Sequence, residues 1–267
     1  HNDARRQRQM CIRDSSIPLA RIDDAVTRIL KVKLRNGLFE NPIVKNDALQ
    51  VIGSDSHRDI ARQAVRESMV VLKNQDIIPI SKNSKSIVVA GRGADNLGMQ
   101  CGGWTINWQG GQGDITVGTT ILDGIKKSVS ADTNVIYSID GKDLAMAKDE
   151  LAIVVIGEDP YTEFFGDKDN LDLLNDDIET ITNLKNKGYK VMVLLISGRP
   201  MNIADHINSW DGFAAVWLPG TEGDGISDIL FGDFQSSGKL SYPWPIKAEY
   251  GANAEDKDLL FNFGFGL

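Results

Sequence analysis

From residue 57 onward, short continuous apolar runs alternate with segments in which apolar residues recur at helical spacing. The runs are rich in β-branched residues and hold few polar positions, which is typical of strands buried on both faces of a sheet. They are Ser86–Ala90, Leu151–Ile156, Lys190–Ser197 and Phe213–Leu218. The helical segments are 57–73, 118–128, 173–187 and 201–208. Strands that alternate with helices predict an α/β fold, a three-layer sandwich around a mostly parallel sheet.

In the helical segment 57–73, the spacing predicts that Ile60, Ala64 and Val71 face the core. Another helix is predicted near the start of the chain, where Gly37 occupies the place of a left-handed C-cap. Its apolar positions are Ile22, Val26, Ile29, Leu30 and Leu34. The chain then continues irregularly to about residue 56. This helix either ends a preceding domain or packs on the α/β domain, and its pattern fits both.

The first fifteen residues differ from the rest of the chain. The segment His1–Ser15 is basic and has neither hydrophobic periodicity nor the apolar h-region of a signal peptide. We interpret it as an artefact of cloning or sequence assembly and set it apart from the fold. It contains Cys11, which together with Cys101 forms neither a metal-ligand nor a redox spacing. We therefore expect no metal and no cofactor.

Composition narrows the classes of function. Apolar residues make up 42% and charged residues 25%, as in ordinary globular proteins. A net charge of −8 and a pI near 5.0 argue against a nucleic acid as partner, because proteins that bind nucleic acids concentrate Lys and Arg. No apolar run approaches the roughly 20 residues that span a bilayer, so a membrane partner is not expected either.

The candidate chemistry lies where the predicted strands end, since ligands of such sheets bind beyond the carboxyl ends of the strands. Trp104 and Trp108 lie in the glycine-rich loop after the first strand, and flat indoles of this kind stack on sugar rings. Both could instead be packed within a surface loop. Glu158 and Glu163 follow the second strand and are either ordinary loop acids or catalytic ones. For Arg199, after the third strand, a structural bond to a neighbouring carboxylate is favoured over substrate contact.

Other chemistries find weak support. The segment Gly91–Asn96 begins like a dinucleotide loop but has Asn where the third glycine belongs, so a nucleotide-binding domain stays only an alternative. Gly238-Lys239 lacks the spacing of a phosphate loop, and no G-x-S-x-G elbow occurs. His57 and His206 are expected on helix surfaces rather than as bases. These exclusions leave carboxylate chemistry on a sugar.

Several motifs in order resemble glycoside hydrolase family 3, in its β-glucan exohydrolase and β-glucosidase branch. The matching segments extend from about residue 21 to residue 267 and include ARIDDAVTRILKVKLRNGLFE, HRDIARQAVRESMVVLKN, CGGWTINWQGG, GEDPYTEFFGD, LISGRP, WLPGTEGDGISDILFGDF and FNFGFGL. The resemblance implies an N-terminal (β/α)₈-type barrel, missing here, followed by this α/β domain. We then expect the last barrel helix and a linker at 16–56, the sandwich at 57–246 and a packed tail at 247–267.

The resemblance also implies roles for single residues. Glu163, in the PYTE segment, matches the general acid/base of a retaining exo-acting enzyme, and Trp104 and Trp108 match the aromatic clamp on the aglycone side. The nucleophilic Asp belongs to the barrel, in a Ser-Asp-Trp-like motif that this chain does not contain. The expected partners are a β-glucoside or β-glucan oligosaccharide and the barrel itself. A non-catalytic carbohydrate-binding domain is the alternative, and the family suggests a periplasmic or secreted location.

Overall fold

The structure, a computed structural model, describes residues 16–43, 46–148, 150–249 and 255–267. The segment 1–15, and with it Cys11, lies outside these residues. Contacts divide the chain into two units, residues 1–54 and 55–267, and each is described by itself. The cut falls in the irregular stretch that follows the first predicted helix.

The first unit contains the helix that periodicity predicted, α2 (Leu19–Arg35), and a 3₁₀-helix, η1 (Asn46–Val51). Gly37 adopts a φ of 63°, and its N–H donates to the Leu34 carbonyl at 3.0 Å, so the predicted left-handed cap is confirmed. None of the α2 side chains is buried. Whether α2 belongs to a preceding domain stays a prediction.

The second unit is built on a six-stranded sheet with the strand order β1-β6-β5-β4-β2-β3. Its strands are β1 (Val70–Asn74), β2 (Ser86–Ala90), β3 (Asn134–Ser138), β4 (Leu151–Gly157), β5 (Lys190–Ile196) and β6 (Gly212–Trp217). All neighbours pair in parallel except β1, which pairs antiparallel with β6. The central strands are buried along nearly their whole length, as their continuous apolar runs predicted.

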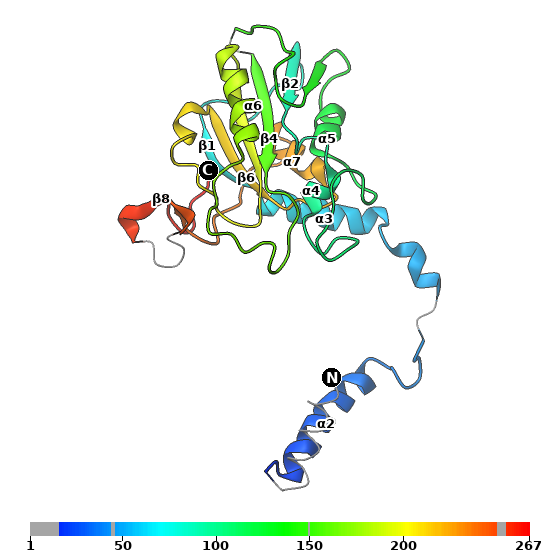
Figure 1. Ribbon diagram of the computed structural model, residues 1–267. Coiled ribbons are helices and arrows are strands. Elements are labelled where there is room, and N and C mark those ends of the chain that lie inside the picture. The colour runs from blue at the N-terminus through cyan, green and yellow to red at the C-terminus, as the bar shows by residue number, and fades with distance from the viewer. Residues whose placement is uncertain (1–15, 44–45, 149, 250–254) are drawn as a thin grey trace. The chain divides into compact units, whose positions relative to one another are not determined.

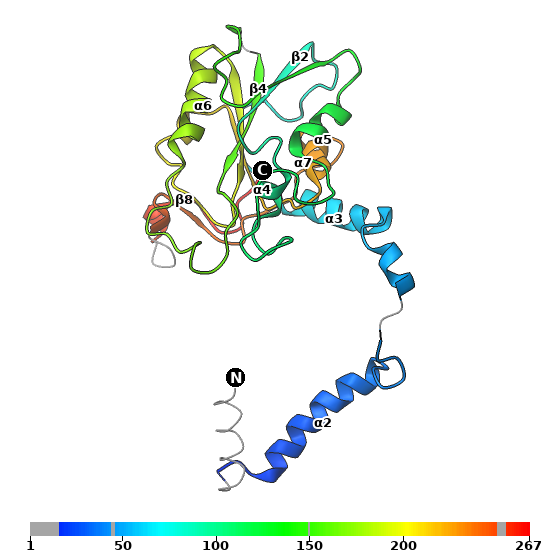
Figure 2. The same ribbon diagram turned by 45° about the vertical axis from the view of Figure 1, so that its right-hand side comes forward.

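Helices cover both faces of the sheet and complete three layers (Figures 1 and 2). They are α3 (Asp55–Ser68), α4 (Leu97–Cys101), α5 (Ile121–Ser128) and α7 (Gly223–Leu230) on one face and α6 (Asn175–Asn186) on the other. One hydrophobic core lies on each face of the sheet. Val65, Ile121 and Ile226 belong to the first core, and Leu184 and Trp210 belong to the second. The predicted α/β fold class is therefore confirmed.

The predicted helix over 57–73 is wrong in its last third. Helix α3 ends at Ser68, and the next residues form the edge strand β1, whose Val70 lies opposite Ala215 of β6. Val71 is buried as expected, but in a strand. The run Val70–Leu72 can continue a helix or form a strand, and the free edge of β6 decides in favour of the strand.

The predicted core face of α3 is also wrong: Ile60 is 71% exposed, Ala64 is exposed, and Val65 is the buried residue instead. The helix docks on α7 through a polar face. Three arginines of α3 bind carboxylates at the start and in the middle of α7, pairing Arg58 with Glu222 and Arg62 and Arg66 with Asp228. Hydrophobic periodicity misses such an interface because, apart from Val65, the α3 side chains that make these contacts are charged.

The predicted helix over 201–208 is replaced by turns and the 3₁₀-helix η2 (Ile207–Ser209). The Asn202 N–H donates to the Leu171 carbonyl at 2.9 Å, which bridges the segment to a neighbouring loop instead of a helical turn. The predicted helices near 118–128 and 173–187 are present as α5 and α6. Helix α7 and strand β3 were not predicted.

The end of the chain returns to the sheet. Strands β7 (Trp244–Pro245) and β8 (Leu259–Phe261) pair antiparallel, after which the Leu267 N–H donates to the Val71 carbonyl at 2.9 Å. The 3₁₀-helix η4 (Asp256–Asp258) precedes β8. Buried Trp244 donates its indole N–H to the Met201 carbonyl at 2.9 Å, and both residues belong to the second core.

Candidate active site

The loops after β2, β4, β5 and β6 meet at the carboxyl edge of the sheet, because these strands are parallel. The first loop begins with the short helix α4. Asn96 caps it by accepting the Met99 N–H at 3.0 Å, and the same carboxamide oxygen accepts the Gly113 N–H at 2.8 Å. One side chain thus joins both ends of the loop 97–113. The third-glycine position of a dinucleotide motif is here a helix cap.

Two residues of this loop adopt left-handed backbone conformations. Trp104 has a φ of 65° and Ile106 a φ of 66°, which side chains with a Cβ rarely adopt, least of all a β-branched one. The Trp104 N–H donates to the Trp108 carbonyl at 3.0 Å and closes the turn between the two indoles. The loop therefore presents both tryptophans outward at a cost in backbone energy, as is common at functional sites.

The three residues predicted for the site lie together. The Trp108 indole N–H donates to a Glu163 carboxylate oxygen at 2.9 Å, and the rings of Trp104 and Trp108 lie 6.4 Å apart at 54°. Phe164, which was not among the predicted site residues, packs edge-on against Trp108 with 6.4 Å between ring centroids. Trp104 is 67%, Trp108 44% and Phe164 75% exposed. A pair of adjacent phenylalanines in a polar loop was the available signal for Phe164.

The electrostatics of Glu163 favour its ionised form. The hydrogen bond from Trp108 stabilises the carboxylate and lowers the pKa of Glu163 below the ordinary value. Glu163 is fully exposed, so burial offers little opposition to this effect. In this environment the side chain is an anion and a hydrogen-bond acceptor at neutral pH.

The second glutamate of the loop, Glu158, has a structural partner. It is buried, and its carboxylate accepts hydrogen bonds from Arg199 at 2.7 and 3.2 Å, which confirms the expected bond of Arg199 to a neighbouring carboxylate. The Arg199 guanidinium lies 4.4 Å from the ring centroid of Tyr161. Burial and the nearby charge of Glu158 raise the pKa of Tyr161 to about 12, so its phenol stays neutral.

Arg92 holds the start of the same loop, a role for which the sequence pattern offered no signal. Its guanidinium binds Asp159, the Gly157 carbonyl and, at 3.2 Å, buried Asp177 of α6. The positive charge of Arg92 thereby offsets the negative charges of Asp159 and Asp177. Gly91, beside Arg92, packs so closely on β4 that a Cβ would overlap the Val155 carbonyl. The glycines after β2 thus serve strand packing.

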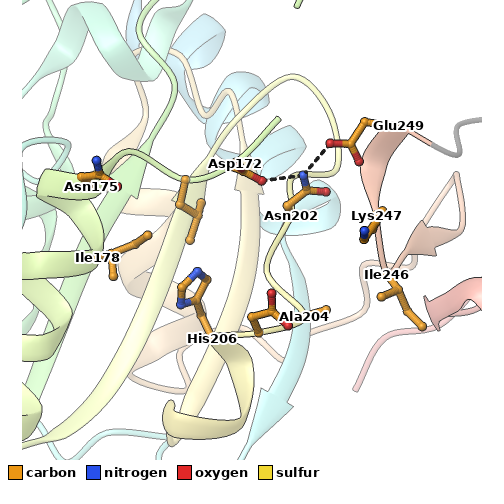
Figure 3. A pocket seen from close by; sticks show the side chains of 11 residues that line it. Asp172, Asn175, Ile178, Asn202, Ala204, His206, Ile246, Lys247 and Glu249 are labelled. Atoms are coloured by element: carbon orange, nitrogen blue, oxygen red, sulfur yellow. Dashed lines mark hydrogen bonds between the residues drawn. The ribbon is translucent and has the colours of Figure 1, made fainter. Parts of the chain in front are cut away.

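A separate hollow of about 420 Å³ lies between the start of α6 and the segment 202–206 (Figure 3). Asn202 crosses its rim and donates to Asp172 at 2.7 Å and to Glu249 at 3.1 Å. His206 lines this hollow from the turn before η2, so the expectation of a helix-surface position is wrong for it. His57 is exposed on α3, as expected. Neither histidine belongs to the edge that carries Glu163.

Neither a metal site nor a membrane-spanning helix is found among the residues that the structure describes. In this part of the chain, His, Cys, Asp and Glu side chains form no group of three or more that could hold a metal ion. Within the same residues, every helix is too short or too polar to cross a bilayer. Cys101 is a half-buried free thiol whose pKa is raised by burial.

The model of the glycosyl hydrolase family 3 C-terminal domain matches residues 69–267. A lysosomal beta glucosidase of Dictyostelium discoideum is 32% identical over 285 aligned residues, which cover 94% of this chain and 34% of that protein. A periplasmic beta-glucosidase of Salmonella typhimurium is 27% identical, covering 88% of this chain and 35% of that protein. The chain thus spans about a third of the length of these relatives.

Solved structures agree in fold. The exo-1,3/1,4-beta-glucanase of a Pseudoalteromonas species superposes with a TM-score of 0.83 at 36% identity, covering 97% of this chain and 34% of that one. A beta-glucosidase of Listeria innocua, solved with glucose, superposes with a TM-score of 0.76 at 23% identity, covering 97% of this chain and 40% of that one. At that identity the likeness supports the fold alone.

Proposed function

We propose, because this chain belongs to glycosyl hydrolase family 3 and matches the C-terminal domain of that family, that it supplies one half of the active site of a retaining, exo-acting β-glucosidase or β-glucan glucohydrolase. Glu163 is the general acid/base in this proposal, and Trp104 and Trp108 form the clamp on the aglycone side. The nucleophilic Asp lies in a (β/α)₈-type barrel of the same polypeptide. The substrate is a β-glucoside or β-glucan oligosaccharide.

The observation that carries the proposal is the contact between the Trp108 indole and the Glu163 carboxylate at 2.9 Å. It joins an aromatic platform, on which the apolar face of a sugar ring can lie, to a carboxyl group beside that platform. Both groups are exposed at the edge of the sheet where α/β domains bind ligands.

Retaining hydrolysis needs two carboxyl groups about 5–5.5 Å apart, one as nucleophile and one as acid and then base. Two carboxylates of the same loop, Glu158 and Asp159, are bound by Arg199 and Arg92 and are poorly suited to attack an anomeric carbon. In the proposal the second group comes from outside this loop. The barrel in the proposal supplies it.

The division of the active site between two domains also accounts for the ionised state of Glu163 in this domain. A general acid must hold a proton near neutral pH, yet the Trp108 hydrogen bond keeps the pKa of Glu163 low in this domain. A nucleophilic carboxylate placed opposite it, together with loss of solvent, would raise that pKa. Glu163 thus becomes an acid only when both halves of the site are assembled.

The test uses the complete enzyme, in which this chain follows its barrel, with aryl β-glucosides of good and poor leaving groups. Glu163→Gln should lower kcat/KM for poor leaving groups by about 10²–10⁴-fold and much less for activated aryl glucosides. Asp169→Asn is the comparison, because Asp169 is an exposed acid that lies just beyond this loop, and it should show no such dependence on the leaving group. Equal losses for both substrate types in Glu163→Gln would refute the assignment.

A second measurement separates this proposal from a non-catalytic carbohydrate-binding domain. The 267-residue chain alone should hydrolyse no aryl β-glucoside, while the complete enzyme does. Saturable glucoside binding without turnover by the complete protein would favour the binding domain. Turnover by the chain alone, abolished in Glu163→Ala, would place a nucleophile within these residues.

For the cellular location, the periplasmic and lysosomal relatives suggest an exported protein.

A further inference from the structure

We propose that Arg199 is a positioning residue, whose guanidinium clamps both ends of the loop 158–167 and so keeps Glu163 against Trp108. Its Nη2 and Nε atoms bind the Glu158 carboxylate at 2.7 and 3.2 Å, at the beginning of the loop. Its Nη1 atom donates to the Gly166 carbonyl at 2.6 Å, at the end. Glu163 lies between these two anchors. The role of the clamp in catalysis rests on the proposed function, whereas its geometry does not.

The loop closes around the clamp. The Gly166 N–H donates to the Thr162 carbonyl at 2.8 Å, which makes a tight turn with Glu163 and Phe164 at its tip. Phe164 adopts a φ of 67°, a conformation that persists only where surrounding contacts enforce it. Arg199 binds the carbonyl of the residue that closes this turn. It thus supplies one of the contacts that hold the strained tip.

Tyr161 fills the space inside the clamp. Its ring lies under the Arg199 guanidinium, 4.4 Å from centroid to Cζ, and neighbouring glycines leave room for it. A Cβ at Gly198 would lie 2.7 Å from the Tyr161 hydroxyl, and one at Gly166 would overlap the ring. The backbone of Tyr161 also packs on Gly103, where a Cβ would overlap the Tyr161 carbonyl. The clamp is thereby coupled to the loop that carries Trp104 and Trp108.

Burial strengthens the hydrogen bonds of the clamp. The Glu158 side chain is 3% exposed and that of Arg199 is 23% exposed, so water competes poorly for their hydrogen bonds. Arginine suits this position because its planar fork can bind a carboxylate on one edge and a carbonyl on another. Lys168 lies 3.7 Å from Glu158 but is half exposed and contacts only the carboxylate. It lacks the second anchor.

The test measures the position of Glu163 without any substrate. In the ¹⁵N-labelled chain, the Trp108 indole resonance, identified with Trp108→Phe, should titrate with the Glu163 carboxyl and cease to titrate in Glu163→Gln. The clamp is removed in the double variant Arg199→Met with Glu158→Gln, which leaves no unpaired buried charge. The shift of Trp108 with pH should then fall by about half or more, because a hydrogen bond weakens steeply once its geometry is lost. Its midpoint should rise toward the ordinary glutamate pKa of about 4.3.

The matched control is Arg58→Met with Glu222→Gln. This Arg–Glu pair joins α3 to the start of α7, at 3.2 Å and with side-chain exposures of 29% and 4%, close to those of the clamp. It has the same ionic chemistry and similar burial but does not touch the loop 158–167. The control should keep the titration of Trp108 unchanged. An equal loss in the control would mean that general loosening, not the clamp, moves Glu163.

Arg199→Lys is studied in parallel, since it keeps a cation beside Glu158 and should therefore fold even if the double variant does not. A lysine ammonium cannot bind the carboxylate and the Gly166 carbonyl in one fixed plane, so the Trp108 titration should weaken here too. An unchanged amplitude and midpoint in either folded variant would overturn the proposal.

Activity of the complete enzyme separates this inference from the proposed function. If Arg199→Lys lowers kcat for poor leaving groups more than it changes KM, the clamp serves catalysis. If Glu163→Gln leaves activity intact while the clamp variants still disturb Trp108, the proposed function fails and the positioning role stands. If Glu163→Gln abolishes activity while the clamp variants titrate normally, only the positioning role fails.

Discussion

Replacing Asp228 by Asn tests whether ionic contacts, rather than apolar packing, hold helix α3 to α7. Asp228 is 2% exposed, and its carboxylate accepts hydrogen bonds from Arg62 at 2.5 and 2.7 Å and from Arg66 at 2.6 Å. On α3 itself, Val65 is the buried side chain. Docking of this helix should therefore depend strongly on one carboxylate.

The expected loss in the free energy of unfolding follows from the groups that remain after the substitution. A hydrogen bond to a charged group contributes about 1.5–3 kcal/mol, and Asn keeps one acceptor oxygen for these arginines. The arginines are 34% and 26% exposed and regain water, so no fully buried cation is left behind. We expect Asp228→Asn to lower the free energy of unfolding by about 2–3 kcal/mol at pH 7. The control Asp233→Asn breaks the exposed pair with Lys82 and should cost below about 1 kcal/mol.

The effect should depend on pH with a definite sign. Burial alone would raise the pKa of Asp228, but the hydrogen bonds and charges of Arg62 and Arg66 outweigh it and hold the pKa below its ordinary value. A depressed carboxyl pKa stabilises the fold above the unfolded value of about 3.9, and this contribution disappears as the pH falls through the folded value. The difference between parent and Asp228→Asn should be constant from about pH 5 to 7 and shrink below about pH 4.

Urea unfolding of both chains, followed by circular dichroism at pH 7, 5 and 3.5, measures these differences. The ionic account is refuted if Asp228→Asn unfolds like Asp233→Asn, since α3 would then be held by apolar contacts. It is also refuted if the loss at pH 3.5 equals that at pH 7, because the carboxylate charge would then have no part in it.

Three further outcomes are expected. Trp108→Phe removes the hydrogen bond that lowers the pKa of Glu163, so the carboxyl titration followed by ¹³C NMR should move upward; an unchanged midpoint would contradict the contact. Gly157→Ala should destabilise the fold by about 2 kcal/mol or more in urea unfolding, because a Cβ there would overlap a carbonyl of β5, and near-parent stability would show that the strands can separate. In a chain with Cys11→Ser, Cys101 should react with a thiol reagent at pH 8 much more slowly in the folded than in the urea-unfolded state, since burial raises its pKa; equal rates would count against this.

The sheet and the place of the site follow from the sequence. Strands such as Leu151–Gly157 are apolar at every position because both faces are covered, and this local composition holds in any tertiary context. Once the strands are known to be parallel, their carboxyl ends lie at one edge, and the loops with Trp104, Trp108 and Glu163 must meet there. The likeness of the motifs to a hydrolase family was equally legible, because it rests on residue identity.

The contacts between these loops required the tertiary structure. Trp108 and Glu163 are 55 residues apart, and the 2.9 Å hydrogen bond between them depends on two strained turns and on packing at Gly103. The bond of Arg199 to the Gly166 carbonyl involves a backbone group, which leaves no mark in the sequence. Such contacts join positions that no local pattern relates.

The predictions that proved wrong have the same physical origin. The segment Val70–Leu72 becomes a strand because β6 offers an unpaired edge, and 201–208 lacks a helix because its backbone pairs with Leu171. Helix α3 turns its arginines rather than Ile60 toward the domain, because buried carboxylates of α7 bind them. Local periodicity determines which segments can be buried; partners distant in the chain decide which of them are, and by what contacts.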